Sequence, residues 1–160
     1  LQVSKFSFRF VRQASHKTTI MTQYVLGHKI MPQSVTGNFD LVIGETPSGT
    51  PGPPPHYHNT YHEVFLVIEG EMEFMVNGKS MVLKNGDSVN LPPSSVHTFA
   101  NKSNSHCKWV NIHSPKGFLS FFEDFGIPET DKFALLKSTD PEIIKKVMET
   151  ASKYDMIITI

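Results

Sequence analysis

The sequence has a single cysteine and no excess of charge of either sign. Because Cys107 cannot form an internal disulfide, packing must hold the fold together, and a reducing, cytoplasmic compartment is the simplest fit. Fifteen basic residues balance fifteen acidic ones, which argues against a nucleic-acid-binding protein or one attracted to anionic membranes. No apolar run approaches the roughly 20 residues that span a bilayer. These absences favour a soluble protein that acts on a small molecule.

Acidic residues are also lacking at the start of the chain, where Asp40 is the first of them. The basic segment before it could indicate a transit peptide. However, Phe6, Phe8 and Phe10 alternate with polar residues, which favours an ordered N-terminal strand. A start of the natural protein at Met21 is an alternative that the sequence leaves open.

The 160 residues, 39% of them hydrophobic, are enough to bury one core. Short strand-like segments alternate with turn signals through the middle of the chain, which is typical of an all-β barrel or sandwich. We therefore expect a single domain in three parts. These are an N-terminal strand or extension over 1–24, a β-barrel over 25–113 and a C-terminal helical segment over 114–160.

Turn signals separate the expected strands. Asn77-Gly78 is a strong hairpin signal, and Asn85-Gly86-Asp87 predicts the next turn. A loop rich in glycine and proline, over 46–55, leads to His56. Strands are expected at about 39–44, 63–69, 72–76, 81–83, 89–91, 97–101 and 109–112.

Two helices are expected after the strands, packed outside the barrel. The first has phenylalanines at helical spacing over 118–125 and stops at Gly126-Ile127-Pro128. The second begins at Asp140-Pro141 and continues through Ile143, Ile144, Val147 and Met148.

A group of four residues could hold a metal ion. His56 and His58 lie two apart, so on an extended strand both imidazoles project from one face. Glu63 can return to that face past a bend, and His97 could arrive from another strand. Three nitrogens and one oxygen suit Fe, Ni, Mn, Co, Cu or Zn. On spacing alone, ordinary surface polarity is an alternative, and we interpret the other histidines as structural or exposed: His16, His28, His62, His106 and His113.

Two motifs place these residues in a familiar pattern. The string His56-x-His58-x4-Glu63-x6-Gly70 resembles the first motif of the cupin superfamily. The string Gly86-x5-Pro92-x-Ser94-x2-His97-x3-Asn101 resembles the second, with Ser94 where the family usually has glycine. The resemblance implies a cupin barrel, also called a double-stranded β-helix or jelly roll. It also implies one divalent transition metal on His56, His58, Glu63 and His97.

Further similarities point to one group of cupins. Thr60-Tyr61, Glu63-Val64-Phe65 and Val96-His97 resemble the bacterial quercetinase-like flavonol dioxygenases, as does Pro115-Lys116-Gly117-Phe118. His62 lengthens the gap before the carboxylate by one residue relative to that group. The resemblance implies a homodimeric, metal-dependent dioxygenase that acts on a small aromatic or enolic substrate.

In such an enzyme Glu63 would be the catalytic base. Phe65 and Phe99 share strand faces with Glu63 and His97, so they, with Phe74, are candidates to line a substrate pocket. Ordinary core packing is the alternative for these three rings. Two further functions remain open for the chain: a non-catalytic cupin that binds a small molecule or sugar, and a metal-dependent isomerase or lyase.

Overall fold

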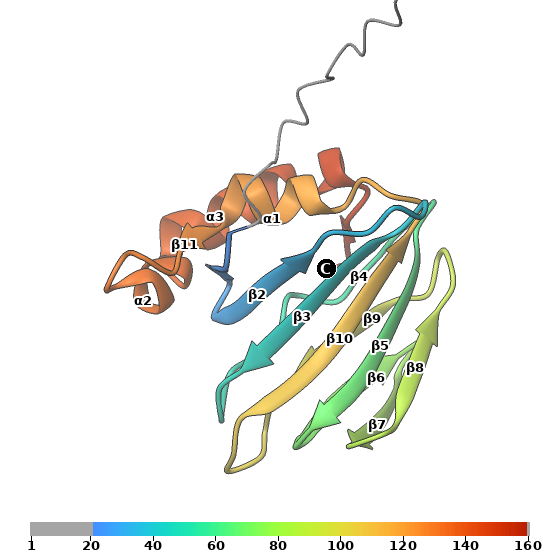
Figure 1. The fold of residues 1–160 in the computed structure, drawn as a ribbon. Helices are drawn as coiled ribbons and strands as arrows, with labels where there is room; N and C mark the ends of the chain where they lie inside the picture. Colours follow the sequence, from blue (N-terminus) through green and yellow to red (C-terminus); the bar gives the residue numbers. More distant parts are fainter. Residues whose placement is uncertain (1–20, 160) are drawn as a thin grey trace, which may run out of the picture.

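Two antiparallel sheets face each other in the computed structural model, which describes residues 21–159 (Figure 1). The N-terminal strand expected at Phe6, Phe8 and Phe10 lies outside these residues. The first sheet has the order β11-β1-β2-β3-β10-β5-β8 and comprises β1 (Gln23–Val25), β2 (His28–Gln33), β3 (Asp40–Thr46), β5 (His62–Glu69), β8 (Ser88–Leu91), β10 (Cys107–Ser114) and β11 (Ile127–Pro128). The second has the order β12-β4-β9-β6-β7 and comprises β4 (His56–Tyr57), β6 (Glu71–Val76), β7 (Lys79–Lys84), β9 (His97–Ala100) and β12 (Ile157–Ile158).

The expected all-β fold is confirmed, but its closure into a barrel needs correction. Within residues 21–159 the strands of one sheet form no ladder with those of the other, so the sheets make a sandwich. Apolar alternation in a sequence shows that a strand has one buried face. It does not show which strand edges are hydrogen-bonded, and therefore cannot distinguish a sandwich from a barrel.

The core lies between the sheets and is rich in aromatic rings. Buried and partly buried residues alternate along β3 and β10, as expected for strands with one face on a core. Phe65 lies within 5.3 Å, between ring centroids, of Phe74, Phe99 and Trp109. These four rings are buried and join strands of both sheets.

Gly44 on β3 makes room for the largest of these rings. A Cβ at this position would come within 2.2 Å of the indole of Trp109, its partner across the β3–β10 ladder. Any residue other than glycine at position 44 would therefore have to displace the indole. β3 continues past this glycine to Thr46, two residues beyond the expected end of the strand at 44.

The hairpin signal at Asn77-Gly78 is also confirmed. Both residues have positive φ, 49° and 79°, and Val76 pairs with Lys79. Positive φ at both central positions is what a type I′ turn requires, and Asn-Gly satisfies it at little energetic cost. The turn fixes the register of β6 against β7.

Helices lie over one end of the two sheets (Figure 1). The two expected helices are present as α1 (Leu119–Phe125) and α3 (Pro141–Thr150), and the side chain of Asp140 accepts a hydrogen bond from the Glu142 amide at the start of α3. A third, α2 (Ala134–Ser138), is too short to show a period. A 3-10 turn, η1 (Ala151–Tyr154), follows α3.

The segment 114–160 was expected to be helical, yet it also adds a strand to each sheet. β11 pairs with β1, and β12 pairs with β4. Two-residue strands carry no periodic signal, so sequence analysis could not find them. Among residues 21–159 no helix has both the length and the apolar character needed to cross a membrane.

Candidate metal centre

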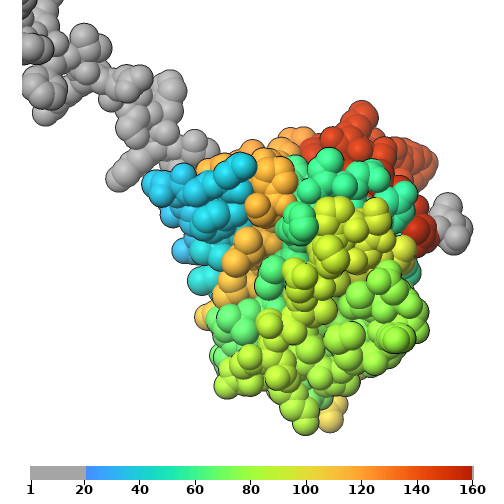
Figure 2. Space-filling model, turned by 90° about the vertical axis from the view of Figure 1, so that its right-hand side faces the viewer, coloured from blue at the N-terminus to red at the C-terminus, as the bar shows by residue number. Residues whose placement is uncertain are grey.

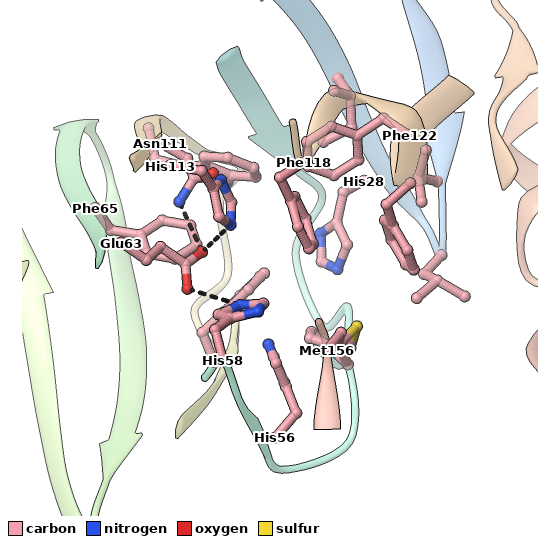
Figure 3. A pocket seen from close by; sticks show the side chains of 17 residues that line it. His28, His56, His58, Glu63, Phe65, Asn111, His113, Phe118, Phe122 and Met156 are labelled. Carbon is pink, nitrogen blue, oxygen red and sulfur yellow. Dashed lines mark hydrogen bonds and ion pairs between the residues drawn. The ribbon is translucent and has the colours of Figure 1, made fainter. Parts of the chain in front are cut away.

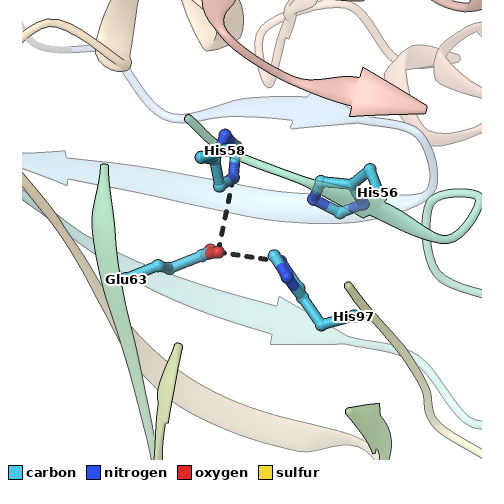
Figure 4. Close-up of side chains that lie close together, drawn as sticks. All are labelled: His56, His58, Glu63 and His97. Atoms are coloured by element: carbon cyan, nitrogen blue, oxygen red, sulfur yellow. Dashed lines mark ion pairs between the residues drawn. The ribbon is translucent and has the colours of Figure 1, made fainter. Parts of the chain in front are cut away.

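The four expected metal ligands converge between the sheets (Figure 4). One ligand atom from each of His56, His58, Glu63 and His97 lies within 4.8 Å of those of the others, and all four residues are buried. Glu63 Oε2 lies 2.9 Å from Nε2 of His97 and 3.5 Å from Nε2 of His58. Three separate stretches of chain, at β4, β5 and β9, supply the group.

Backbone carbonyls orient the three imidazoles. A carbonyl can only accept a hydrogen bond, so each Nδ1 that contacts one carries the proton and leaves the Nε2 lone pair free. Metal-binding histidines are commonly oriented in this way through their second nitrogen. The Nδ1 contacts are His56 with Pro54 at 2.9 Å, His58 with Asp155 at 2.7 Å and His97 with Ser95 at 2.9 Å.

Three atoms of the group are buried without a hydrogen bond from the described residues. They are Nε2 of His58, Nε2 of His97 and Oε2 of Glu63. The approach of the His97 nitrogen to this oxygen is short, but it does not have hydrogen-bond geometry. Buried polar atoms without partners are rare because they lose hydration. A cation bound between them would satisfy all three, so the donor set fits a divalent transition metal.

The charge state of the group also fits a cation. Burial alone would raise the pKa of Glu63, but the surrounding imidazoles, with His113 first, outweigh burial and hold this pKa well below its ordinary value. Burial, helped by the neighbouring His97, lowers the pKa of His56 to about 3. An anionic carboxylate and a neutral imidazole are the forms that bind metal ions.

Two residues of β10 hold the other oxygen of the carboxylate. Glu63 Oε1 accepts a hydrogen bond from Asn111 Nδ2 at 2.9 Å and lies 3.2 Å from Nε2 of His113. The His113 ring stacks on Phe118, with 4.0 Å between centroids. Oε1 is therefore held from the β10 side, while Oε2 faces the three imidazoles. His113 is 3% exposed, so it belongs to this site as a structural neighbour.

The sequence contained one signal for these two residues. Trp109, Asn111 and His113 alternate along β10, so a strand that buries Trp109 also buries the other two. Their polarity at buried positions then requires polar partners. The identity of the partner, Glu63, follows only from the pairing of β10 with β5.

The C-terminal segment completes the site from the other side, and sequence analysis missed this role. The carbonyl of Asp155 contacts the His58 imidazole. Its carboxylate accepts hydrogen bonds from the backbone amides of Asn59 at 3.0 Å and Thr60 at 2.8 Å. Figure 2 shows the red C-terminal residues packed beside the green part of the chain. No local pattern could predict contacts that span nearly a hundred residues.

Ser94 stands where cupins usually have glycine, and its backbone explains that preference. It has φ of 68°, in the left-handed region that favours glycine. Its amide donates a hydrogen bond to the carbonyl of His58 at 2.7 Å. The serine keeps the turn, and the turn helps to place this histidine.

A cavity of about 60 Å³ adjoins the site, and His56, His58 and Glu63 form part of its wall (Figure 3). Of the three phenylalanines expected in a pocket, Phe65 and Phe99 line it. Phe74 does not, because it packs behind them in the core. The remaining wall is mainly apolar and includes Val25, Ile30, Phe118, Phe122 and Met156.

The remaining histidines differ in their burial and in whether they line the cavity. His28, which we had interpreted as structural or exposed, is buried and lines the cavity. His62 and His106 are exposed, as expected. His16 lies outside the described residues.

Comparisons with known proteins agree with this architecture. Residues 42–113, which include all four candidate ligands, match the cupin domain family. Over 103 residues the chain is 31% identical to a quercetin 2,3-dioxygenase of Bacillus subtilis (strain 168); the match covers 63% of this chain and 30% of that protein. The chain therefore spans less than a third of the length of this relative.

Solved structures share the fold. An RmlC-like cupin from Shewanella frigidimarina NCIMB 400 superposes with a TM-score of 0.54 and 25% identity, over 72% of this chain and 94% of that one. KdgF from Halomonas sp. superposes with a TM-score of 0.53 and 21% identity, over 57% of this chain and 81% of that one. At this identity the similarity shows a shared fold and nothing about function. Residues 42–113 thus match the cupin domain family, and the two facing sheets that contain them share the fold of solved cupins.

Proposed function

We propose that this chain is a metal-dependent oxidoreductase of the quercetinase-like dioxygenase type, acting on a small enolic or aromatic substrate. The observation that carries the proposal is the convergence of buried, unpartnered ligand atoms of His58, Glu63 and His97, with His56 beside them. The similarity to a quercetin 2,3-dioxygenase supports the type of reaction. The donor set suits Fe, Ni, Mn, Co, Cu or Zn.

The residues around the site have separate roles in this proposal. When bound, the metal supplies Lewis acidity that favours the ionised form of a substrate hydroxyl. Glu63 is anionic and accepts the proton of that hydroxyl. Asn111 and His113 hold the carboxylate in position through its second oxygen. Phe65 and Phe99 provide apolar contacts for the substrate and exclude water.

The size of the cavity favours a compact substrate. Sites for drug-sized ligands typically enclose about 300–1,000 Å³, whereas this cavity measures about 60 Å³. A short enol fits the space with little rearrangement. A larger aromatic substrate requires Phe118 and Phe122 to move, because these rings form one wall of the cavity.

The test combines metal analysis with oxygen consumption. Apoprotein is loaded separately with Fe, Ni, Mn or Co and mixed with small enols, catechols and flavonols in an oxygen electrode. We expect metal-dependent oxygen uptake with at least one enol or phenol. His58→Ala is expected to weaken metal binding strongly and to remove oxygen uptake, whereas the control His106→Ala, at an exposed histidine, is expected to retain both.

Three other outcomes of this test would contradict the proposed dioxygenase reaction. Substrate turnover without oxygen uptake would identify a metal-dependent isomerase or lyase. Ligand binding without turnover, for every metal and substrate, would identify a binding cupin. Absence of metal from the wild type under all loading conditions would contradict a metal site altogether.

A further inference from the structure

His28 on β2 is a buried imidazole that the proposed reaction does not use. It is 5% exposed and lines the cavity, with its ring centroid 5.2 Å from that of Phe99. Figure 3 shows its ring across the cavity from Glu63. Its Nε2 is buried and has no hydrogen-bond partner among the described residues. A polar atom in this position requires a partner that enters the cavity.

The hydrogen bonds behind the ring determine which nitrogen carries the proton. Thr46 Oγ1 lies 2.9 Å from both Trp109 Nε1 and His28 Nδ1. An indole can only donate, so Trp109 donates to this hydroxyl, whose single proton is then available for His28 Nδ1. The opposite arrangement would leave the proton of a fully buried hydroxyl without an acceptor. Nδ1 is therefore the acceptor, and Nε2 carries a hydrogen that faces the cavity.

The ring stays neutral at physiological pH. Burial lowers the pKa of His28 to about 4; the nearby Pro51 carbonyl opposes this by a smaller amount, although its contact with the ring does not have hydrogen-bond geometry. A neutral N–H donor suits an uncharged oxygen such as a carbonyl, hydroxyl or ether. An anionic group would have to lose its hydration without gaining a countercharge, which is costly in an apolar wall.

The surroundings separate this donor from the metal centre. The other polar side chains of the cavity wall are candidate ligands or are hydrogen-bonded or ion-paired to Glu63. The neighbours of His28 in the cavity wall include Val25, its partner across the β1–β2 ladder, and the ring of Phe99, and both are apolar. A substrate that satisfies both ends has an enol or phenol at Glu63, an apolar body and a second oxygen at His28.

We propose that His28 is a specificity-determining residue whose Nε2–H donates a hydrogen bond to this second, uncharged oxygen of the substrate. The proposal rests on the proposed binding of an enol at the metal centre. It narrows the substrate class to compact enols or phenols that carry a further oxygen at the end remote from the reacting hydroxyl.

The test compares two probes that differ by one oxygen: pentane-2,4-dione and 1-hydroxypentane-2,4-dione. Their dissociation constants are measured by calorimetry with protein loaded with Ni²⁺ and kept free of oxygen, so that no turnover interferes. We expect the wild type to bind the hydroxy probe roughly three- to tenfold more tightly, the range of one neutral hydrogen bond. His28→Leu should remove this preference, and His28→Gln, which keeps a donor, should retain part of it.

Controls separate specificity from damage to the fold. Nickel content should be the same in all variants, because His28 is not among the candidate ligands. His106→Leu, at an exposed histidine, should leave the preference unchanged. His28→Met, a second variant without a donor, replaces His28→Leu if the latter does not fold.

Two outcomes would overturn the proposal in distinguishable ways. If both probes bind and His28→Leu keeps the wild-type preference, or the wild type has none, the role of His28 is wrong while enol binding stands. If neither probe binds to nickel-loaded wild type, enol binding itself fails, and the role of His28 fails with it.

Discussion

Along two strands, β5 and β9, the side chains that face the interior between the sheets change from polar to apolar. β5 contributes Glu63 and then Phe65, and β9 contributes His97 and then Phe99. We call the group His56, His58, Glu63 and His97 the polar end, and the group Phe65, Phe74, Phe99 and Trp109 the apolar end. Both are buried, and only the polar end contains atoms without hydrogen-bond partners among the described residues.

This difference shows how one scaffold separates stability from function. The apolar end removes large aromatic surfaces from water, which is the main favourable contribution to folding. The polar end places charged and polar groups where they lose hydration, and so contributes little to folding by itself. Substitutions at the two ends should therefore affect different measurements.

Phe74→Ala tests the apolar end and should give the largest change in stability. Phe74 is 1% exposed and packs against Phe65 and Phe99, so its truncation should reduce the free energy of unfolding by about 3–5 kcal/mol. Urea unfolding followed by circular dichroism measures this. Met81→Ala, at its partly exposed partner across the β6–β7 ladder, is the control and should cost less than about 1 kcal/mol. Equal losses in the two variants would remove the distinction between the ends.

His58→Ala tests the polar end. Loss of one ligand should weaken metal binding by about 100-fold or more, because ligand substitutions exceed the 10- to 100-fold effects of their supporting residues. The metal-free variant should remain folded, since the apolar end is intact. Calorimetric titration with Ni²⁺ and circular dichroism give the two readouts. Global unfolding of the variant would show that the polar end also has a structural role.

Asp155→Ala should weaken metal binding at the polar end less than His58→Ala does. The substitution removes the carboxylate that holds Asn59 and Thr60 but keeps the carbonyl that contacts His58. Metal affinity should fall by about tenfold, as expected for a supporting residue. Asp131→Ala is the control, because this aspartate makes comparable contacts away from the site. An unchanged affinity for Asp155→Ala would mean that the loop is held in place without the carboxylate.

A change of pH should produce the smallest of these effects, a gradual loss of metal from the wild type. Imidazoles bind metal only when neutral, so protons compete with the metal as the pH falls. Burial lowers the pKa of His97, but the adjacent Glu63 carboxylate outweighs burial and shifts it above 6.5. Metal content after dialysis should therefore fall as the pH is lowered from 8 to 5, because the raised pKa of His97 brings its protonation into this range. A flat profile between pH 5 and 8 would be inconsistent with histidine ligands.

Local patterns in the sequence were enough for most of the fold and for the four candidate ligands. The Asn77-Gly78 turn and the alternation along β5 and β10 are properties of neighbouring residues, so they can be read without coordinates. The two cupin motifs then placed His56, His58, Glu63 and His97 in one group.

Contacts between distant segments account for what could not be predicted. Thr46 and Trp109 set the tautomer of His28 only because β2, β3 and β10 are neighbours in the first sheet. Asp155 supports His58 only because η1 and β12 return to β4. Neither relation has a signature in local hydrophobicity or spacing.

The pairing of β12 with β4 also affects when the metal centre can form. During synthesis the strands that carry the four candidate ligands emerge first, and the segment that contacts His58 follows some sixty residues after His97. A nascent chain can therefore bury the aromatic core before the metal centre is complete. The site therefore reaches its full metal affinity only after β12 and the adjoining residues have docked on β4.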